Sequence, residues 1–178
     1  NTRTFCYDKR MSPEYPYQIV TFIDSSPAIG EGVYQGGNGW YPQLTLKRRF
    51  KVDGATDETI IARVEGYFKH QSPIPVQIGT LTQTDRMPVR VLPILNSEDL
   101  IHMHRGLIAH MGGDIKSRYP ERDGENYYPH ITAEYGGKNV IDVNRYENRA
   151  FIMSRVCIIK DAEDGDSRVV SYIDMNGV

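Results

Sequence analysis

The sequence predicts an α+β fold with two pseudo-symmetric lobes of antiparallel strands and helices. One observation is an internal repeat, because residues 41–46 (YPQLTL) and residues 128–133 (YPHITA) are near copies of one another. Another is the order of the predicted elements: a strand, a motif strand, a helix and two strands precede a helix, a motif strand and two strands. A third is the length of 178 residues, which is enough to bury most of the apolar surface. We therefore expect a single bilobal domain over residues 1–178.

The first lobe begins with a predicted core strand at residues 17–24, where apolar side chains occupy both faces. Residues 25–39 contain five glycines in fifteen positions, which favours a mobile loop over a helix. Alternation of apolar and polar residues returns at residues 41–52, so the first copy of the repeat is expected on a strand.

A helix and a hairpin complete this lobe. Thr56 or Asp57 can cap the helix, which is expected to end near Gln71. Its apolar stripe consists of Ile60, Ile61, Val64 and Phe68. Residues 76–84 and 89–95 then read as two strands that begin after prolines and form a β-hairpin.

The second lobe begins with another helix. Ser97 is a suitable N-cap, and two acidic residues follow it in the first turn. Apolar positions at helical spacing continue to Met111, before a pair of glycines. The polar residues 114–126 predict a surface loop that gives access to a substrate, and residues 127–135 form the second motif strand.

The C-terminal part predicts two further strands, at residues 150–160 and 168–175. An acidic turn at residues 161–166 separates them. This turn lacks the oxygen spacing and terminal glutamate of an EF-hand loop, which favours a solvated turn over a calcium site.

The two copies of the repeat each carry a pair of polar side chains on one face. Gln43 and Thr45 are two residues apart on the first motif strand, as are His130 and Thr132 on the second. Because side chains alternate along a strand, both members of each pair point the same way. A proline at the start of a strand explains the shared Tyr-Pro, but not the threonine that follows each polar residue by two positions.

These pairs resemble the two His-x-Thr motifs of the two-histidine (2H) phosphoesterases, and most closely the 2′-5′ RNA ligase-like group. The resemblance spans most of the chain and implies helices on the outside of two lobes around a central cleft. It implies phosphodiester cleavage without a metal or cofactor. His130 is then one proton-transfer group, acid or base, and Thr45 and Thr132 donate hydrogen bonds to the phosphate oxygens.

Gln43 stands where the family has its first histidine. An amide can hold a phosphate or a water molecule but cannot carry a proton near neutral pH. Loss of an acid or base typically costs about 10² to 10⁴ in rate. The change is either a natural loss of function or an engineered one. Glu134, which shares the face of Thr132 by strand alternation, is a candidate replacement proton carrier.

Further residues are candidates for binding the substrate. Alternation places Lys47 and Arg49 on the face of Gln43, which would give the cleft positive charge, although a solvated strand end would show the same residues. Trp40 and Tyr128 flank the motifs and can stack on bases. The chain has 12 tyrosines, so some must lie beside any site by chance.

Composition narrows the possible partners. A formal net charge of −2 provides no basic field for a long duplex, so any nucleic-acid ligand should be short. The two cysteines have no zinc-site spacing, and no apolar run is long enough to span a bilayer. On a helix, His102 and His104 would project in different directions, which argues against a metal pair, and His104 falls on the apolar stripe. We expect a cytoplasmic protein without a membrane or protein partner.

The sequence thus predicts a metal-independent phosphodiesterase that acts on a short RNA end, or on a 2′,3′-cyclic, 2′-5′-linked or cyclic oligonucleotide, and that Gln43 impairs. The alternative is a nucleotide-binding module that captures such ligands without cleaving them. A ligase activity has no nucleotidyl-transfer motif to support it.

Overall fold

The computed structural model describes residues 14–34, 40–84, 89–135 and 137–177. Its main sheet contains the strands β1 Tyr17–Phe22, β2 Gln43–Val52, β4 Thr82–Gln83, β5 Arg90–Pro93, β6 Ile115–Ser117, β7 His130–Thr132, β11 Arg155–Asp161 and β12 Ser167–Asp174. They lie in the order β12-β11-β1-β2-β7-β5-β4, with β6 beside β2, and all neighbours are antiparallel. The motif strands β2 and β7 are therefore neighbours at the middle of one sheet.

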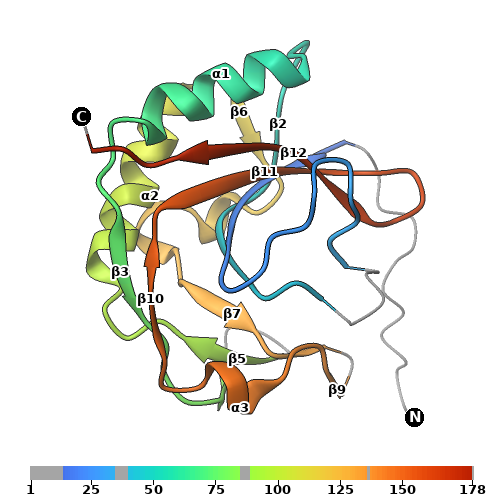
Figure 1. Cartoon of the computed structure of the whole chain (residues 1–178). Helices are drawn as coiled ribbons and strands as arrows, with labels where there is room; N and C mark the ends of the chain where they lie inside the picture. The colour runs from blue at the N-terminus through green and yellow to red at the C-terminus, as the bar shows by residue number, and fades with distance from the viewer. Residues whose placement is uncertain (1–13, 35–39, 85–88, 136, 178) are drawn as a thin grey trace.

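Two long helices cover one flank of this sheet (Figure 1). They are α1 Asp57–Phe68 and α2 Glu98–Met111, and a short helix, α3 Val143–Tyr146, lies near the other end of the molecule. The Thr56 hydroxyl caps α1 by accepting a hydrogen bond from the backbone N–H of Thr59. Helix α2 stops at Gly112, whose φ of 89° is a conformation that glycine adopts without strain.

The core lies between the helices and the sheet. From α1 it takes the predicted stripe residues Ile60, Val64 and Phe68, which are fully buried, whereas Ile61 is only partly buried. From α2 it takes Leu100, Met103, Leu107 and Met111. Leu44 of β2 and Ile131 of β7 are also fully buried, so one face of each motif strand packs on the same core. The predicted α+β class with antiparallel sheet and outer helices is confirmed.

The predicted hairpin at residues 76–84 and 89–95 is confirmed in part, because the two segments pair with one another but the first also begins in a different sheet. Residues Ile74–Gln77 form β3, which pairs with β10 (Ala150–Met153) in a separate two-stranded sheet. The hairpin consists of the pairing of β4 with β5 and an antiparallel bridge between Ile78 and Ile94. The chain crosses between the sheets at Ile78 and Gly79, whose N–H groups donate to Arg149 and Pro93 carbonyls respectively. The predicted strand 150–160 is likewise divided into β10 and β11, which have different partners.

The predicted surface loop at residues 114–126 is also wrong in part. It contains β6, which adds to the edge of β2, and two 3₁₀ turns, η1 Pro120–Arg122 and η2 Gly124–Asn126. The segment folds onto the sheet because Asp123 forms an ion pair with the buried Lys47. A further small sheet joins β8 Glu134–Tyr135 to β9 Lys138–Asn139. Over the described ranges, no helix has the length and apolar character required to cross a membrane.

Candidate active site

The two copies of the repeat meet where β2 pairs with β7. Leu44 lies directly opposite Ile131 in this antiparallel pair. The register therefore sets Gln43 opposite Thr132 and Thr45 opposite His130, with all four side chains on the face away from the buried Leu44 and Ile131. Strand pairing thus brings together the polar residues that the sequence placed 87 positions apart.

These four side chains line one cavity of about 790 Å³. That volume suits a ligand of nucleotide size. Other side chains that line the cavity and matter below are Tyr34, Trp40, Tyr128, Arg48, Arg118 and Arg122. The cavity therefore combines the repeat with aromatic and cationic groups.

His130 is held as a neutral imidazole with one nitrogen available to a ligand. Its Nδ1–H donates a hydrogen bond of 2.7 Å to the carbonyl of Tyr128, so Nε2 is left as the acceptor. Burial, with a smaller contribution from the charges of Arg48 and Arg122, lowers the pKa of His130 to about 4. The Tyr128 ring stacks on the imidazole, with 5.6 Å between the ring centroids. The orientation of the imidazole is therefore fixed, with Nε2 left as a hydrogen-bond acceptor.

Thr45 and Thr132 flank this imidazole and the amide of Gln43. Both threonines are partly buried, and neither hydroxyl hydrogen-bonds another residue in the described part of the chain. A hydroxyl can donate one hydrogen bond and rotate to suit its acceptor. The two side chains can therefore both donate to oxygens of one anionic group between the strands.

The amide of Gln43 is fixed on one side only. Its Nε2 donates to the Tyr34 hydroxyl over 3.1 Å, and its Oε1 is buried with no hydrogen-bond partner among the described residues. An unpaired buried acceptor is costly, and a ligand N–H or O–H would satisfy it. Gln43 can therefore bind a ligand but cannot exchange a proton with it.

The prediction that Lys47 shares the cleft face is wrong, because β2 contains bulges. Val20 of β1 pairs with Thr45, but Ile19, one residue earlier, pairs with Lys47, so Leu46 is an extra residue. An extra residue reverses the alternation beyond it. Lys47 consequently points away from the cavity and is 1% exposed, whereas Arg48 lines the cavity.

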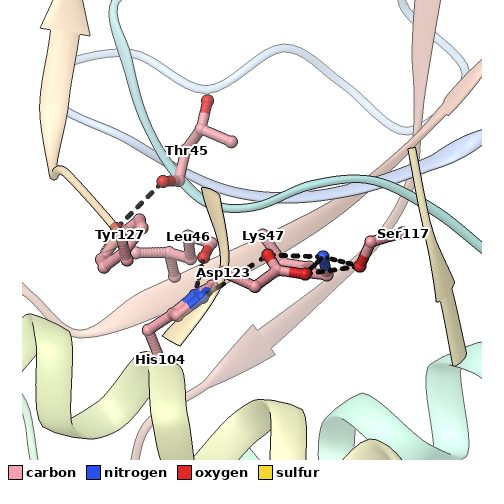
Figure 2. Close-up of polar contacts among 7 residues, drawn as sticks. All are labelled: Thr45, Leu46, Lys47, His104, Ser117, Asp123 and Tyr127. Atoms are coloured by element: carbon pink, nitrogen blue, oxygen red, sulfur yellow. Dashed lines mark hydrogen bonds and ion pairs between the residues drawn. The ribbon is translucent and has the colours of Figure 1, made fainter. Parts of the chain in front are cut away.

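Figure 2 shows the buried polar network that Lys47 enters. Its Nζ donates to both carboxylate oxygens of Asp123, at 2.7 and 2.8 Å, and to the Ser117 hydroxyl at 2.5 Å. Nε2 of His104 lies 3.6 Å from the same carboxylate. Burial lowers the pKa values of both Lys47 and His104, and the Asp123 charge opposes both effects. The network fixes residues 117–123 against β2.

The same network supports the bulge itself. The carbonyl of Thr45 accepts a hydrogen bond from the Tyr127 hydroxyl, and the carbonyl of Leu46 accepts one from Nδ1 of His104 (Figure 2). The rings of His104 and Tyr127 stack at 4.1 Å. The prediction of His104 as a hydrogen-bonded histidine at the edge of the core is confirmed, and its hydrogen bond supports the backbone of the first motif.

Arg49 lines the cavity, as the sequence predicted, but its charge is paired. The guanidinium contacts the carboxylate of Asp161, and both side chains are at most 10% exposed. The predicted acidic turn therefore begins with a buried carboxylate, and Asp166 at its other end is also buried. Among the described residues, no three His, Cys, Asp or Glu side chains gather as a metal-binding group.

Trp40 lies in an aromatic group at the cavity. Its ring centroid is 4.9 Å from that of Tyr34 and 5.5 Å from that of Tyr135. Trp40 and Tyr128 both line the cavity, where the sequence predicted them. These flat faces can stack on a nucleobase.

Glu134 is a second residue whose predicted position is wrong. It does not line the cavity, and its carboxylate lies 3.4 Å from the guanidinium of Arg90. The strand alternation that would have placed it beside Thr132 ends at Ala133, after which the chain turns into the separate small sheet of β8 and β9. Glu134 therefore cannot take the place of Gln43 in proton transfer at this site.

Sequence reasoning missed Arg48, Arg118, Arg122 and Tyr34. The bulge that presents Arg48 has no signal in the residue pattern. Arg118 and Arg122 fall in the segment interpreted as a surface loop, and only the accumulation of arginines on both sides of Tyr119 could have pointed to them. Tyr34 lies in the glycine-rich segment, where its N–H donates to the buried Asp166 carboxylate.

The chain matches no protein-family profile and no curated protein, but it does match solved structures. LigT of E. coli, solved with NADP⁺, has a TM-score of 0.55 and 13% identity, over 92% of this chain and 99% of LigT. A solved phosphoesterase has a TM-score of 0.59 and 14% identity, over 91% and 98% of the two chains. The protein TT0787 of Thermus thermophilus has a TM-score of 0.55 and 11% identity, over 91% and 98%. At these identities the likeness establishes the fold, and the chain has the α+β fold of the LigT-like 2H phosphoesterases.

Proposed function

We propose that this protein is a metal-independent phosphodiesterase for 2′,3′-cyclic, 2′-5′-linked or cyclic oligonucleotides, and that Gln43 impairs it. One observation carries the proposal: the two motif strands pair at Leu44 and Ile131, so that two threonines, an imidazole and an amide face one cavity. A single bilobal domain over residues 1–178 is part of the proposal, since both motif strands contribute to that cavity.

The chemistry follows from the fixed orientation of His130. Its unprotonated Nε2 can take a proton from an attacking hydroxyl or water, because Nδ1 is committed to the Tyr128 carbonyl. Thr45 and Thr132 can donate hydrogen bonds to the non-bridging phosphate oxygens, where negative charge grows in the transition state. His130 thus supplies one of the two proton transfers that cleavage needs.

The second proton transfer is where Gln43 limits the reaction. The leaving oxygen needs a proton on the side opposite the base, and an amide cannot supply it. We expect the unchanged chain to be slower by about 10² to 10⁴ than one with an imidazole at this position.

The aromatic group supports a nucleotide as the ligand. Trp40 and Tyr34 both line the cavity, with their rings tilted at 59° to one another, and either ring can stack on a base. LigT, which shares the fold, has been solved with ATP and with 3′-AMP.

The test compares the unchanged chain with Gln43→His, His130→Ala and a double variant, in EDTA, on a panel of cyclic and 2′-5′-linked nucleotides. Gln43→His should raise turnover, and His130→Ala should abolish it in either background. His102→Ala is the matched control, because His102 is an exposed histidine outside the cavity, and it should leave turnover unchanged. Turnover that persists in His130→Ala, or that EDTA removes, would contradict the proposal.

The second candidate is a capture module that binds the same nucleotides without cleaving them. The buried, unpartnered Oε1 of Gln43 favours it, because an amide adds a hydrogen-bond acceptor at the point where the family fold would carry a proton donor. Tight binding by the unchanged chain, with no cleavage by Gln43→His, would select this candidate.

A further inference from the structure

Three arginines surround one tyrosine ring on the wall of the cavity. The guanidinium carbons of Arg48 and Arg122 each lie 5.3 Å from the centroid of the Tyr119 ring, and that of Arg118 lies 5.6 Å from it. All four side chains line the cavity. The aromatic ring attracts each cation, but it supplies no negative charge.

The charge of this cluster is largely uncompensated. Arg48 and Arg118 make no ion pair within the described ranges, and Arg122 meets Glu121 only at 3.7 Å, in a pair exposed to solvent. Burial and the charge of Arg122 lower the pKa of Arg48, which shows that the two cations repel one another. Lys47 and Arg49, on the same strand, each have a carboxylate partner. The fold thus pairs Lys47 and Arg49 with buried or half-buried carboxylates, whereas the arginines of the cluster have at most one long, exposed ion pair in the described part of the chain.

The segment that carries Arg118, Tyr119 and Arg122 is anchored to β2 at both ends. The N–H of Arg118 donates to the carbonyl of Arg49 over 2.9 Å, directly beyond the pairing of β6 with β2. On the other side of Tyr119, Asp123 is anchored to Lys47. The backbone that carries these arginines is therefore fixed beside β2, and an anion among them would offset their like charges.

The cluster extends outward from the reacting position. His130 lies opposite Thr45 on β2, whereas the backbone of Arg118 bonds to Arg49, further along the same strand, and Arg48 lies between the two positions. A phosphodiester at His130 would be within reach of the inner arginines. Arg118 would then meet a group further along the same molecule.

We propose that Arg118, together with Arg48 and Arg122, binds a second phosphate group of the substrate, separate from the diester that His130 acts on. This inference rests on the proposed function and narrows the substrate to nucleotides that carry a free terminal phosphate as well as the reacting diester. A phosphate monoester has oxygens enough for several guanidiniums, and arginine binds such groups through paired hydrogen bonds.

The test measures the dissociation constants of adenosine 2′,3′-cyclic phosphate with a 5′-hydroxyl and with a 5′-phosphate, on the unchanged chain. We expect the 5′-phosphate to tighten binding by about tenfold or more, the range for hydrogen bonds to charged groups. Arg118→Gln should remove most of that advantage, and Arg118→Lys should retain part of it. Arg149→Gln is the matched control, since Arg149 is exposed, has no ion pair among the described residues and lies outside the cavity lining, and it should keep the full advantage.

The outcomes separate this inference from the proposed function. Equal affinity for the two nucleotides, or an advantage that survives Arg118→Gln, overturns the second phosphate site and leaves the phosphodiesterase in place. Inorganic pyrophosphate serves as a probe that needs no base or diester. If neither nucleotide binds but pyrophosphate does, and Arg118→Gln weakens it about tenfold, the phosphate site stands and the nucleotide function fails. If neither nucleotide nor pyrophosphate binds, both fail.

Discussion

Replacing His130 with asparagine measures whether the folded protein holds this imidazole neutral. The pKa of His130 is lowered to about 4 by burial and, to a smaller extent, by Arg48 and Arg122, while an unfolded histidine titrates near 6.5. As the pH falls from 8, the unfolded chain therefore binds a proton before the folded chain does. The contribution of His130 to the free energy of unfolding is therefore fully present above about pH 6.5 and is lost as the pH falls toward 4.

The size of the effect follows from the two pKa values. Between pH 8 and pH 5 the unfolded histidine becomes almost fully protonated, while the folded one stays mostly neutral. The free energy of unfolding should fall by about 2 kcal/mol from this residue alone. His104 contributes in the same direction, because burial also lowers its pKa, so the single variant is needed to isolate His130.

The assay is urea unfolding at pH 8 and at pH 5 for the unchanged chain and for His130→Asn. Between pH 8 and pH 5, the free energy of unfolding should fall by about 2 kcal/mol less for the variant than for the unchanged chain. An NMR titration of the five histidines, with the variant to assign the signal, measures the pKa directly. A pH dependence of stability shared by both proteins, or a His130 signal that titrates near 6.5, would refute the neutral base.

Two further changes test the support beneath the site. Lys47→Met leaves the Asp123 carboxylate without its buried partner and should lower the free energy of unfolding by about 3 to 5 kcal/mol in urea, whereas Lys160→Met, which removes an exposed ion pair, should cost less than about 1 kcal/mol. Similar costs for the two variants would argue against the network. Tyr127→Phe removes the hydroxyl that donates to the carbonyl of Thr45 and should cost about 1 to 3 kcal/mol by the same measurement, and an unchanged stability would show that this bond does not support the bulge.

The motif pair was predictable because it depends on local rules. Alternation along a strand fixes which residues share a face, and the repeat of a polar residue and a threonine identified Gln43, Thr45, His130 and Thr132 from the sequence. The structure adds that Leu44 and Ile131 are partners, which alternation alone does not specify. The same rules gave both long helices, since a capping residue and an apolar stripe are local signals.

Lys47 shows where those rules stop. A bulge adds one residue to β2 and reverses the predicted faces of Lys47 and Arg48, and no residue type marks its position. The bulge is stabilised instead by Tyr127 and His104, which are distant in sequence and donate to the two carbonyls that it exposes. A feature held by non-local contacts cannot be read from the residues at the feature itself.

Residues 114–126 illustrate a second limit. Their polar composition predicted a loop, because exposed segments are usually polar. Here the polar side chains of Asp123 and Ser117 bond to the buried ammonium group of Lys47 and to one another. The segment itself lies along the edge of β2 through the pairing of β6. Composition reports that these side chains need hydrogen-bond partners, but it does not report whether water or the protein provides them.

The arginines around Tyr119 also bear on the meaning of Gln43. Burial, with a smaller contribution from Arg48 and Arg122, lowers the pKa of the neighbouring His130, and an imidazole introduced at position 43 would face the same two cations. We expect such an imidazole to take up a proton more readily once a phosphate has brought negative charge into the cavity. The amide of Gln43 carries no exchangeable proton near neutral pH, so under the proposed function its effect falls on the proton transfer. Under the proposed function, Gln43 therefore separates binding, which we attribute to the arginines and threonines, from turnover, which we attribute to the residue that the first motif supplies.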